Sequence, residues 1–228
     1  GVNIKTSLPS PDTFVQKFKA AKEAGDEVIC ILIASKLSGT YQGAMLAKQI
    51  VDYDGIHVID AGHAAASVAE KMLVIAACRM RDQGCTAEEI ARRLEQLRGN
   101  VRLIACLDTL EYLARGGRLP AAVASIGTKL QLKPIIVFGE NGEIQVVKKC
   151  MGSKRAMRDM TEMVTERRID PEYPVIPIFA QNDRNCQEYV ASLKNAGCEG
   201  TMQAPQGIGA TIGSYIGPGG YGIVFVEK

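Results

Sequence analysis

Apolar residues follow two different periods along the first half of the chain. Residues 28–34 form a continuous apolar run rich in isoleucine, which is typical of a strand buried on both faces of a parallel sheet. Other segments carry apolar residues at helical spacing. The combined pattern predicts helices at residues 12–24, 43–53, 69–83 and 86–97, and strands at residues 28–34, 56–59 and 101–107. This alternation predicts an α/β fold, in which helices cover both faces of a parallel sheet.

Two of the predicted helices carry clear signals at their ends. Asp12 follows Pro11 and is expected to cap the first helix, which Gly25 then ends. The helix at residues 86–97 opens with T-A-E-E, the pattern of a capping box.

The second half of the chain has a different order of elements. Two strands joined through E-N-G predict a hairpin, and a long glycine-rich segment at residues 207–220 is unlike an ordinary core helix. The chain therefore divides into an α/β domain at residues 1–132 and a smaller α+β domain at residues 133–228. The elements predicted in the second domain are strands at residues 133–137, 143–149, 175–180 and 222–226, a short strand near Thr201, and helices at residues 154–167 and 184–196.

Composition narrows the classes of function. The net charge is only +2 and the chain has no Trp, which argues against nucleic-acid binding. No apolar run approaches the roughly 20 residues that cross a bilayer, so the protein is not expected to be embedded in a membrane. Seven cysteines without a C-x-x-C pair predict reduced thiols and a cytoplasmic location, and two histidines exclude a histidine-rich metal site.

Two hydroxyl-rich loops are candidate binding segments. Thr6 lies in T-S-L-P-S-P before the first helix, and Ser38, Gly39 and Thr40 lie in S-K-L-S-G-T after the apolar strand. Hydroxyls and free backbone N–H groups at a helix start bind anions without a charged side chain. Loops that follow parallel strands are also where open α/β sheets bind ligands. Capping of the two helices is an equally good local explanation for these residues.

Two further segments carry charge or small residues. In residues 107–118, two glycines end a short helix before Arg118, which is expected to act as a fixed cation facing a cleft. Asp108 and Glu111 invite a general-acid role, but salt bridges with neighbouring arginines are the commoner outcome. The fourth segment is the glycine-rich run around Ser214. The chain lacks G-x-S-x-G and H-E-x-x-H, so no nucleophile has an obvious base, and an enzyme is not predicted.

These segments resemble the motifs of the DegV family of fatty-acid-binding proteins. T-S-L-P-S-P resembles T-S-Q-P-S-P, and S-K-L-S-G-T-Y-Q-G-A resembles S-S-x-L-S-G-T-Y-Q-S-A. Residues 107–119 are similar to D-D-L-x-Y-L-x-K-G-G-R-I and residues 130–136 to L-N-I-K-P-I-L. Residues 208–222 are similar to I-G-x-x-I-G-x-H-x-G-P-G-x-x-G. The resemblance covers essentially the whole chain, with the motifs in order.

The resemblance implies a two-domain, non-catalytic carrier of a long-chain fatty acid such as palmitate, stearate or oleate. Thr6 and Ser38 would contact the carboxylate at the domain junction, and the acyl tail would run into the first domain. Arg118 and the histidine of the last motif, matched here with Ser214, are associated with the head group or a partner surface. No cofactor is implied. The implied partner is a separate fatty acid kinase, which makes acyl phosphate.

The sequence also departs from the family pattern. Ser214 stands for the histidine, and Ser67 and Ala69 replace glycines in residues 61–69, which is expected to narrow the tail tunnel. His63 is a candidate substitute for the lost head-group partner. The family's first strand, with a D-S-T motif, is not seen before Gly1, so one strand of the parallel sheet is expected to be missing. Two alternatives remain: a phosphotransferase-related enzyme domain, and a regulatory or interaction module with a closed pocket.

Overall fold

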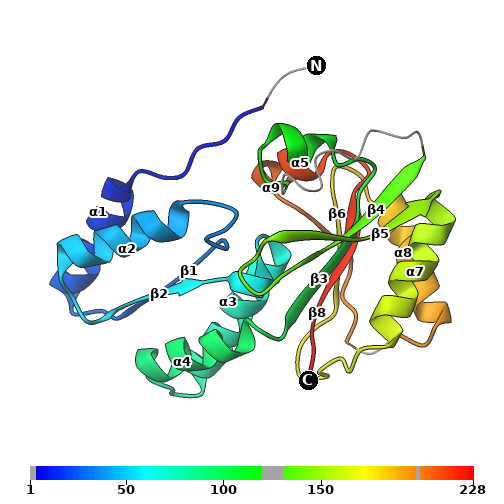
Figure 1. Cartoon of the computed structure of the whole chain (residues 1–228). Helices are drawn as coiled ribbons and strands as arrows, with labels where there is room; N and C mark the ends of the chain where they lie inside the picture. The colour runs from blue at the N-terminus through cyan, green and yellow to red at the C-terminus, as the bar shows by residue number, and fades with distance from the viewer. Residues whose placement is uncertain (1–3, 120–130, 199–200) are drawn as a thin grey trace.

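The computed structural model describes residues 4–119, 131–198 and 201–228 (Figure 1). Within these residues no helix combines the length and the apolar composition needed to span a bilayer. The elements in chain order are α1 (Pro11–Ala24), β1 (Val28–Leu32), α2 (Thr40–Val51), β2 (Ile56–Asp60), η1 (Gly62–Ala64), α3 (Val68–Asp82), α4 (Ala87–Leu97), β3 (Val101–Cys106), α5 (Glu111–Arg115), β4 (Leu132–Phe138), β5 (Ile144–Met151), α7 (Ser153–Thr165), β6 (Ile176–Phe179), α8 (Arg184–Asn195), β7 (Gln206–Gly207), α9 (Ala210–Ile216) and β8 (Tyr221–Val226).

The first sheet consists of β1 and β2, which run parallel from the pair Val28–Ile56 to the pair Leu32–Asp60. Helices α1 and α2 pack together beside it, around the buried ring of Phe18 and the buried Ile56 (Figure 1). A strand, a helix and a second parallel strand therefore follow one another in the predicted order. β1 ends at Leu32 and is half-buried along its whole length, so the prediction that residues 28–34 form a strand buried on both faces is wrong. The mixed α/β fold with a parallel sheet is confirmed.

The second sheet has six strands in the order β5-β4-β3-β8-β6-β7, and every pairing except that of β6 with β7 is antiparallel. Strand β3 lies inside this sheet, between β4 and β8. The strand predicted at residues 101–107 therefore exists, but its placement in the parallel sheet is wrong. A run of apolar residues indicates that a strand forms, and it does not show in which direction the neighbouring strands run.

Both faces of the six-stranded sheet are covered, and β3 shows how (Figure 1). Leu103 and Ala105 belong to a core shared with α3 and α4, whereas Ile104 and Cys106 belong to a second core shared with α7 and α8. This alternation follows from the period of two along a strand. Helices α5 and α9 lie together at one end of the sheet, at the top of Figure 1.

The ends of the helices agree in part with the signals in the sequence. Gly25 ends α1 in the left-handed conformation, and Thr86 and Glu89 form the predicted capping box of α4. The cap of α1 is Ser10, whose hydroxyl accepts a hydrogen bond from the N–H of Asp12, so the prediction that Asp12 caps this helix is wrong. Pro11 is tolerated in the first turn because that position needs no N–H donor, which moves the cap back to Ser10.

The last part of the chain differs from the prediction at two places. Met202 makes only an isolated bridge with Val175, and the short strand β7 begins at Gln206, later than the strand predicted near Thr201. The glycine-rich segment contains helix α9, none of whose residues is fully buried. α9 and the last residue of β7 therefore lie in the segment whose glycines argued against a core element.

The hairpin between β4 and β5 reaches across to the loops that follow β1 and β2. A Cβ atom on Gly142, at the hairpin tip, would collide with Ala34 and would lie 2.9 Å from the carbonyl oxygen of Gly62. β3 also precedes residue 132 and lies inside the six-stranded sheet. The division of the chain into domains at residue 132 stays a prediction.

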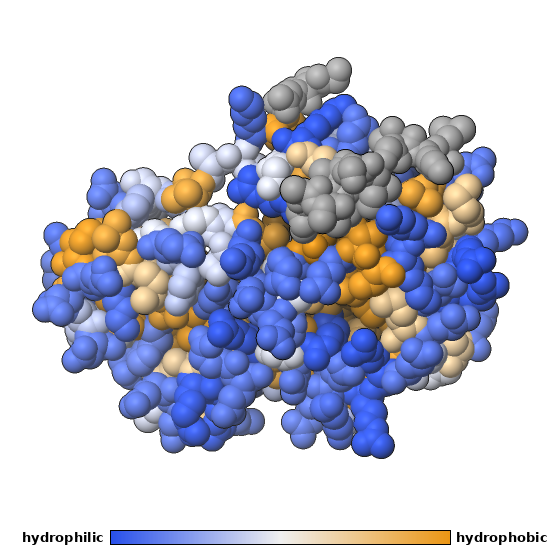
Figure 2. Space-filling model, viewed as in Figure 1, coloured by the Kyte–Doolittle hydropathy of each residue, from blue (hydrophilic) through white to orange (hydrophobic). Residues whose placement is uncertain are grey.

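Several large apolar side chains lie at the surface. Leu46 and Ile50 on α2 are 48% and 57% exposed, and apolar residues gather on the side of Figure 2 where Figure 1 places α1 and α2.

The seven cysteines are all unpaired, and three of them, Cys106, Cys150 and Cys186, are buried.

Candidate functional site

Asp60 connects the loops that follow the two parallel strands. Its Oδ1 atom accepts hydrogen bonds from the N–H of Ser35, at 3.1 Å, and from the N–H of Gly62, at 3.0 Å. The backbone of the same two loops is joined directly, because the N–H of Ala34 donates to the carbonyl of Ala65 at 2.8 Å. One carboxylate at the end of β2 thus holds the start of the loop that carries Ser38.

Ser38 and Thr40 form a local pair of hydroxyls at the start of α2. The two oxygen atoms are 2.8 Å apart, and the N–H of Thr40 donates to the Ser38 hydroxyl at 3.3 Å. Gly39 is the residue that precedes the helix, and it has no side chain to cap it. Ser38 therefore bonds the first N–H group of the helix, which is the local capping role that its sequence allows, and its side chain is half-buried.

Thr6 and Arg118 meet through Tyr215. The Thr6 hydroxyl is hydrogen-bonded to the Tyr215 hydroxyl, and the guanidinium carbon of Arg118 lies 5.1 Å from the centre of the Tyr215 ring. The Nε atom of Arg118 donates to the carbonyl of Leu37 at 3.0 Å, directly before Ser38. We call Thr6, Leu37, Ser38, Arg118 and Tyr215 the hydroxyl–arginine cluster. The cluster contains residues from all four segments that the sequence analysis identified as candidates.

Glycines allow α5 and α9 to approach closely enough to form this cluster. A Cβ atom on Gly116 would collide with the ring of Tyr215, and one on Gly217 would collide with the ring of Tyr112. Each helix thus places a tyrosine ring over a glycine of the other segment. Gly217 has φ of 75°, a conformation that also favours glycine.

Tyr215 is the site residue that sequence reasoning missed. Counted from Ile208, the motif I-G-x-x-I-G-x-H places its histidine at Tyr215, so the match with Ser214 is wrong by one residue. Ser214 donates its hydroxyl to the carbonyl of Thr211 at 2.7 Å, within its own helix. A residue-by-residue count of the motif would have found Tyr215.

The remaining predicted residues have other neighbours. His63 Nδ1 lies 3.2 Å from the carbonyl of Gly99, and burial, together with nearby Arg102, lowers the pKa of its imidazole. These contacts differ from those of the hydroxyl–arginine cluster. Arg115 forms the expected salt bridge with Glu111.

Asp108 pairs with a cation that the sequence did not suggest, since its carboxylate lies 2.6 Å from the Nζ atom of Lys133. Among residues 4–119, 131–198 and 201–228, no group of three or more His, Cys, Asp or Glu is arranged to hold a metal ion.

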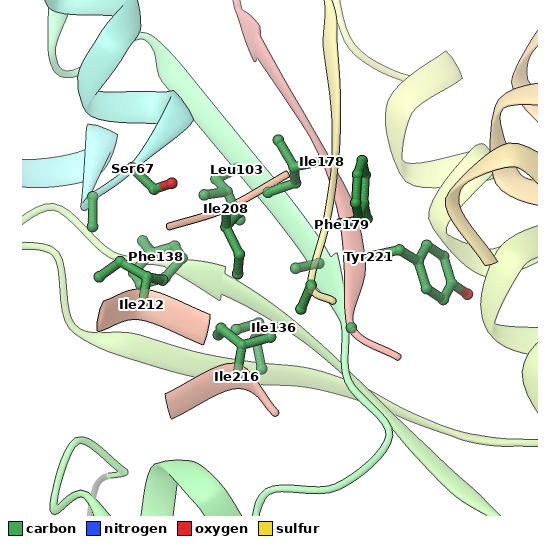
Figure 3. A pocket seen from close by; sticks show the side chains of 14 residues that line it. Ser67, Leu103, Ile136, Phe138, Ile178, Phe179, Ile208, Ile212, Ile216 and Tyr221 are labelled. Atoms are coloured by element: carbon green, nitrogen blue, oxygen red, sulfur yellow. The ribbon is translucent and has the colours of Figure 1, made fainter. Parts of the chain in front are cut away.

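An apolar pocket lies on the α9 side of the six-stranded sheet (Figure 3). Its enclosed volume is about 40 Å³. Ile212 and Ile216 of α9 face the pocket, while Tyr215 of the same helix lies in the hydroxyl–arginine cluster. The described residues that line the pocket are Ala66, Ser67, Leu103, Ala105, Ile136, Phe138, Ile178, Phe179, Ala180, Ile208, Ile212, Ile216, Gly220 and Tyr221.

The segment before α3 that contributes to the pocket wall is strained. Ala65 has φ of 47° and ψ of −80°, and Ser67 has φ of 60° and ψ of −125°. Non-glycine residues rarely adopt positive φ, and outside the left-handed helical region the conformation is costlier still. In the first turn of α3, burial raises the pKa of the Glu70 carboxyl to about 7. Strain and a poorly solvated carboxyl thus occur within six residues of one another.

The chain matches known proteins both in its sequence and in its fold. The DegV family, described as uncharacterised, matches residues 1–228. A DegV domain-containing protein of Caldanaerobacter subterraneus subsp. tengcongensis is 36% identical over 224 residues, which cover 98% of this chain and 79% of that protein. A protein of Thermotoga maritima named fatty acid-binding protein is 30% identical over 230 residues, which cover 98% of this chain and 78% of that protein.

A solved structure agrees with these sequence relatives. The structure of a DegV family protein from Thermus thermophilus, described by its fatty acid binding, superimposes with a TM-score of 0.86 at 30% identity. The match covers 98% of this chain and 79% of that chain. With the family matched from the first residue to the last, this chain belongs to the DegV family.

Proposed function

We propose that this protein is a non-catalytic carrier of a long-chain fatty acid. The carboxylate binds at the hydroxyl–arginine cluster and the acyl tail occupies the apolar pocket. The observation that carries the proposal is the position of α9, which contributes Tyr215 to the cluster and Ile212 and Ile216 to the pocket. A polar cluster joined by one short helix to an apolar pocket matches the two ends of a fatty acid. The names of the relatives from Thermotoga maritima and Thermus thermophilus support the same ligand.

The polar end suits a carboxylate because it offers neutral donors beside a fixed cation. Ser38 and one hydroxyl of the bonded Thr6–Tyr215 pair can each donate to a carboxylate oxygen, and such charge-assisted hydrogen bonds are about twice as strong as neutral ones. Arg118 donates hydrogen bonds from Nε to the carbonyl of Leu37 and from Nη1 to the carbonyl of Gly116, and these bonds fix the guanidinium in place. The cation therefore orients the head group at little further cost in side-chain entropy.

The apolar end supplies most of the binding free energy, at about 0.8 kcal/mol for each buried CH₂. Its enclosed volume of about 40 Å³ is smaller than the roughly 300–1,000 Å³ of drug-sized ligand pockets. An acyl chain therefore needs the side chains of Ile212 and Ile216 to move away from the sheet. The pocket is lined from both sides of residue 132, with Ser67 and Leu103 before it and Ile136 after it. This course of the tail differs from the one that the motif resemblance implies, which runs into the first domain alone.

Phosphorylation of the bound acid is assigned to a separate fatty acid kinase. This partner follows from the motif resemblance, and the carrier itself presents the carboxylate at the hydroxyl–arginine cluster. We place the carrier in the cytoplasm, because seven unpaired cysteines are typical of a reducing compartment. Incubation of the loaded carrier with ATP should yield acyl phosphate only when a fatty acid kinase is added.

The deciding experiment identifies the ligand directly. The purified protein is denatured, extracted with organic solvent and analysed by mass spectrometry, before and after incubation with oleate. We expect a fatty acid with roughly 14–18 carbons, in near-stoichiometric amount. A blank extract in both samples would overturn the proposal.

Two variants locate the head group. Thr6→Val and Ser38→Ala each remove one hydroxyl and should each reduce retention of oleate, while the thermal unfolding midpoint stays close to that of the wild type. Ser192→Ala is the matched control, because this hydroxyl lies on α8 and bonds the carbonyl of Glu188. Wild-type retention in both site variants would move the head-group site elsewhere.

A further inference from the structure

The apolar pocket contains one hydroxyl without an evident structural task. Ser67 is half-buried, and Figure 3 shows its oxygen turned toward the side chains that line the pocket. The other described lining residue with a hydroxyl is Tyr221, and Figure 3 shows its ring extending away from the rest of the lining side chains. The other described residues that line the pocket have apolar side chains, except Gly220, which has none.

Ser67 precedes the first residue of α3, where serine ordinarily caps a helix. Here its hydroxyl makes no capping hydrogen bond. The backbone of Ser67 carries the local contact instead, because its carbonyl accepts from the N–H of Lys71 at 2.9 Å. The usual reason for a serine at this position therefore does not apply.

The backbone conformation of Ser67 is energetically unfavourable for serine. Its φ of 60° and ψ of −125° lie in a region that glycine adopts readily and other residues avoid. A residue held in such a conformation is a signal of function when its side chain faces a binding site. For Ser67, a hydroxyl that faces an apolar pocket and has no hydrogen-bond partner among the described residues is the feature that glycine would not provide.

We propose that Ser67 determines which acyl chains this carrier prefers, and that the favoured ligands carry a hydroxyl or carbonyl oxygen along the chain. The inference rests on the proposed fatty-acid-carrier function and names the ligand class of the same site. A plain acyl chain that fills the pocket removes water from the Ser67 hydroxyl and leaves it without a partner. An oxygenated chain forms a hydrogen bond with it, and each group then satisfies the other.

The energetic consequence has opposite signs for the two ligand classes. Loss of the Ser67 hydroxyl removes a hydrogen bond from the oxygenated chain, which weakens its binding about threefold to tenfold. The same change relieves the plain chain of an unpaired polar group, so its binding becomes equal or tighter. The ratio of the two affinities therefore separates this role from a general loss of binding.

The test measures competition between stearate and 3-, 10- and 12-hydroxystearate. Three positions of the hydroxyl group are compared because the distance of Ser67 from the head-group site determines which carbon of the acyl chain lies beside it. Each acid is titrated against protein loaded with a fluorescent fatty acid, using wild type, Ser67→Ala, Ser67→Gly and the control Ser192→Ala. We expect at least one hydroxystearate to bind the wild type more tightly than stearate. Ser67→Ala and Ser67→Gly should both abolish that preference, and Ser192→Ala should retain it.

The two site variants also separate the hydroxyl from the backbone. Ser67→Gly relieves the positive φ and should raise the thermal unfolding midpoint, whereas Ser67→Ala keeps the strained backbone and should leave the midpoint nearly unchanged. A wild type that never prefers a hydroxystearate, or a preference that survives in both variants, overturns the proposal for Ser67 alone. Failure of every acid to bind overturns the carrier function as well.

Discussion

Thr6 and Tyr215 lie 209 positions apart in the sequence, and their hydroxyl groups are hydrogen-bonded to each other. The contact joins the segment before α1 to α9. Arg118 stacks on the same tyrosine ring and donates a hydrogen bond to the carbonyl of Leu37. The segment before α1, the loop after β1 and helix α9 therefore meet at one place.

Replacement of Tyr215 by Phe removes the hydroxyl and keeps the ring under Arg118. We expect oleate affinity to fall about twofold to twelvefold, which corresponds to the loss of one hydrogen bond of about 0.5–1.5 kcal/mol. In combination with Thr6→Val, the loss should be smaller than the sum of the two single losses, because the two hydroxyls bond each other. Isothermal titration with oleate measures all three variants.

Tyr53→Phe is the control for Tyr215→Phe. Tyr53 follows α2 and packs beside Gly55, so its hydroxyl belongs to a different part of the fold. It should bind oleate like the wild type. Additive losses in the Thr6 and Tyr215 double variant would show that the two residues act at separate places.

Asp60→Ala leaves the N–H groups of Ser35 and Gly62 without their shared acceptor. We expect a loss of about 2 kcal/mol in the free energy of unfolding, together with weaker oleate binding, because the loop that carries Ser38 loses its tie to β2. Asp60→Asn keeps a carbonyl oxygen at the same position and should recover much of both losses. Urea unfolding and oleate titration measure the two effects.

Asp54→Ala is the matched control for Asp60, since this exposed carboxylate lies in the turn before β2. It should change the free energy of unfolding by less than about 0.5 kcal/mol. An Asp60→Ala variant with wild-type stability and binding would show that the two loops hold their positions without the carboxylate.

Gly142→Ala tests the contact between the β4–β5 hairpin and the loops after β1 and β2. Gly142 has φ of 80°, and its added Cβ would collide with Ala34. We expect a destabilisation of about 3 kcal/mol, which combines backbone strain with the collision. Gly197→Ala shares the positive φ of 82° but has open space around it, so it should lose only about 1 kcal/mol.

The difference between these two glycine variants isolates the collision from the strain. Differential scanning calorimetry of both proteins measures it. Equal losses would mean that the hairpin tip moves away from Ala34 at no cost.

Glu70 makes the stability of the protein depend on pH in a predictable direction. Burial raises the pKa of this carboxyl from its ordinary 4.5 to about 7. Between these values the folded protein holds a proton that the unfolded chain has released, so the free energy of unfolding falls as pH rises from about 4.5 to about 7. Glu70→Gln stays uncharged and should lack this fall, which is of order 1–3 kcal/mol.

The measurement is the difference in urea unfolding free energy between wild type and Glu70→Gln at pH 5 and at pH 8. Other carboxyls with shifted pKa values, such as Glu227 and Glu143, have lowered values and are common to both proteins. A difference that is the same at both pH values would show that Glu70 is well solvated in the folded state.

Local signals in the sequence were sufficient for most of the secondary structure. The capping box at Thr86, the end of α1 at Gly25 and the hairpin at E-N-G depend on neighbours within a few residues, and the structure has all three. The cap of α1 shows the limit of such signals. Ser10 and Asp12 are both good caps, and the proline between them decided for Ser10.

The candidate site was predictable as separate segments. Thr6, Ser38 and Arg118 each lie in a loop whose hydroxyls, glycines or charge marked it as a binding segment. Tyr215 was missed because the histidine of the last motif was matched with Ser214, one position too early. Apart from that motif, a tyrosine in a glycine-rich run has no binding signal of its own. Its role arises from the ring that stacks under Arg118 and the hydroxyl that bonds Thr6, and both partners are distant in the sequence.

The apolar run at residues 101–107 was enough to predict a strand, and the structure has β3 at residues 101–106. Only the tertiary structure decided that this strand pairs antiparallel with β4 and β8 and forms a wall of the apolar pocket. Strand direction and the meeting of distant loops depend on which segments pack together. That choice is made by the whole core, and no local pattern contains it.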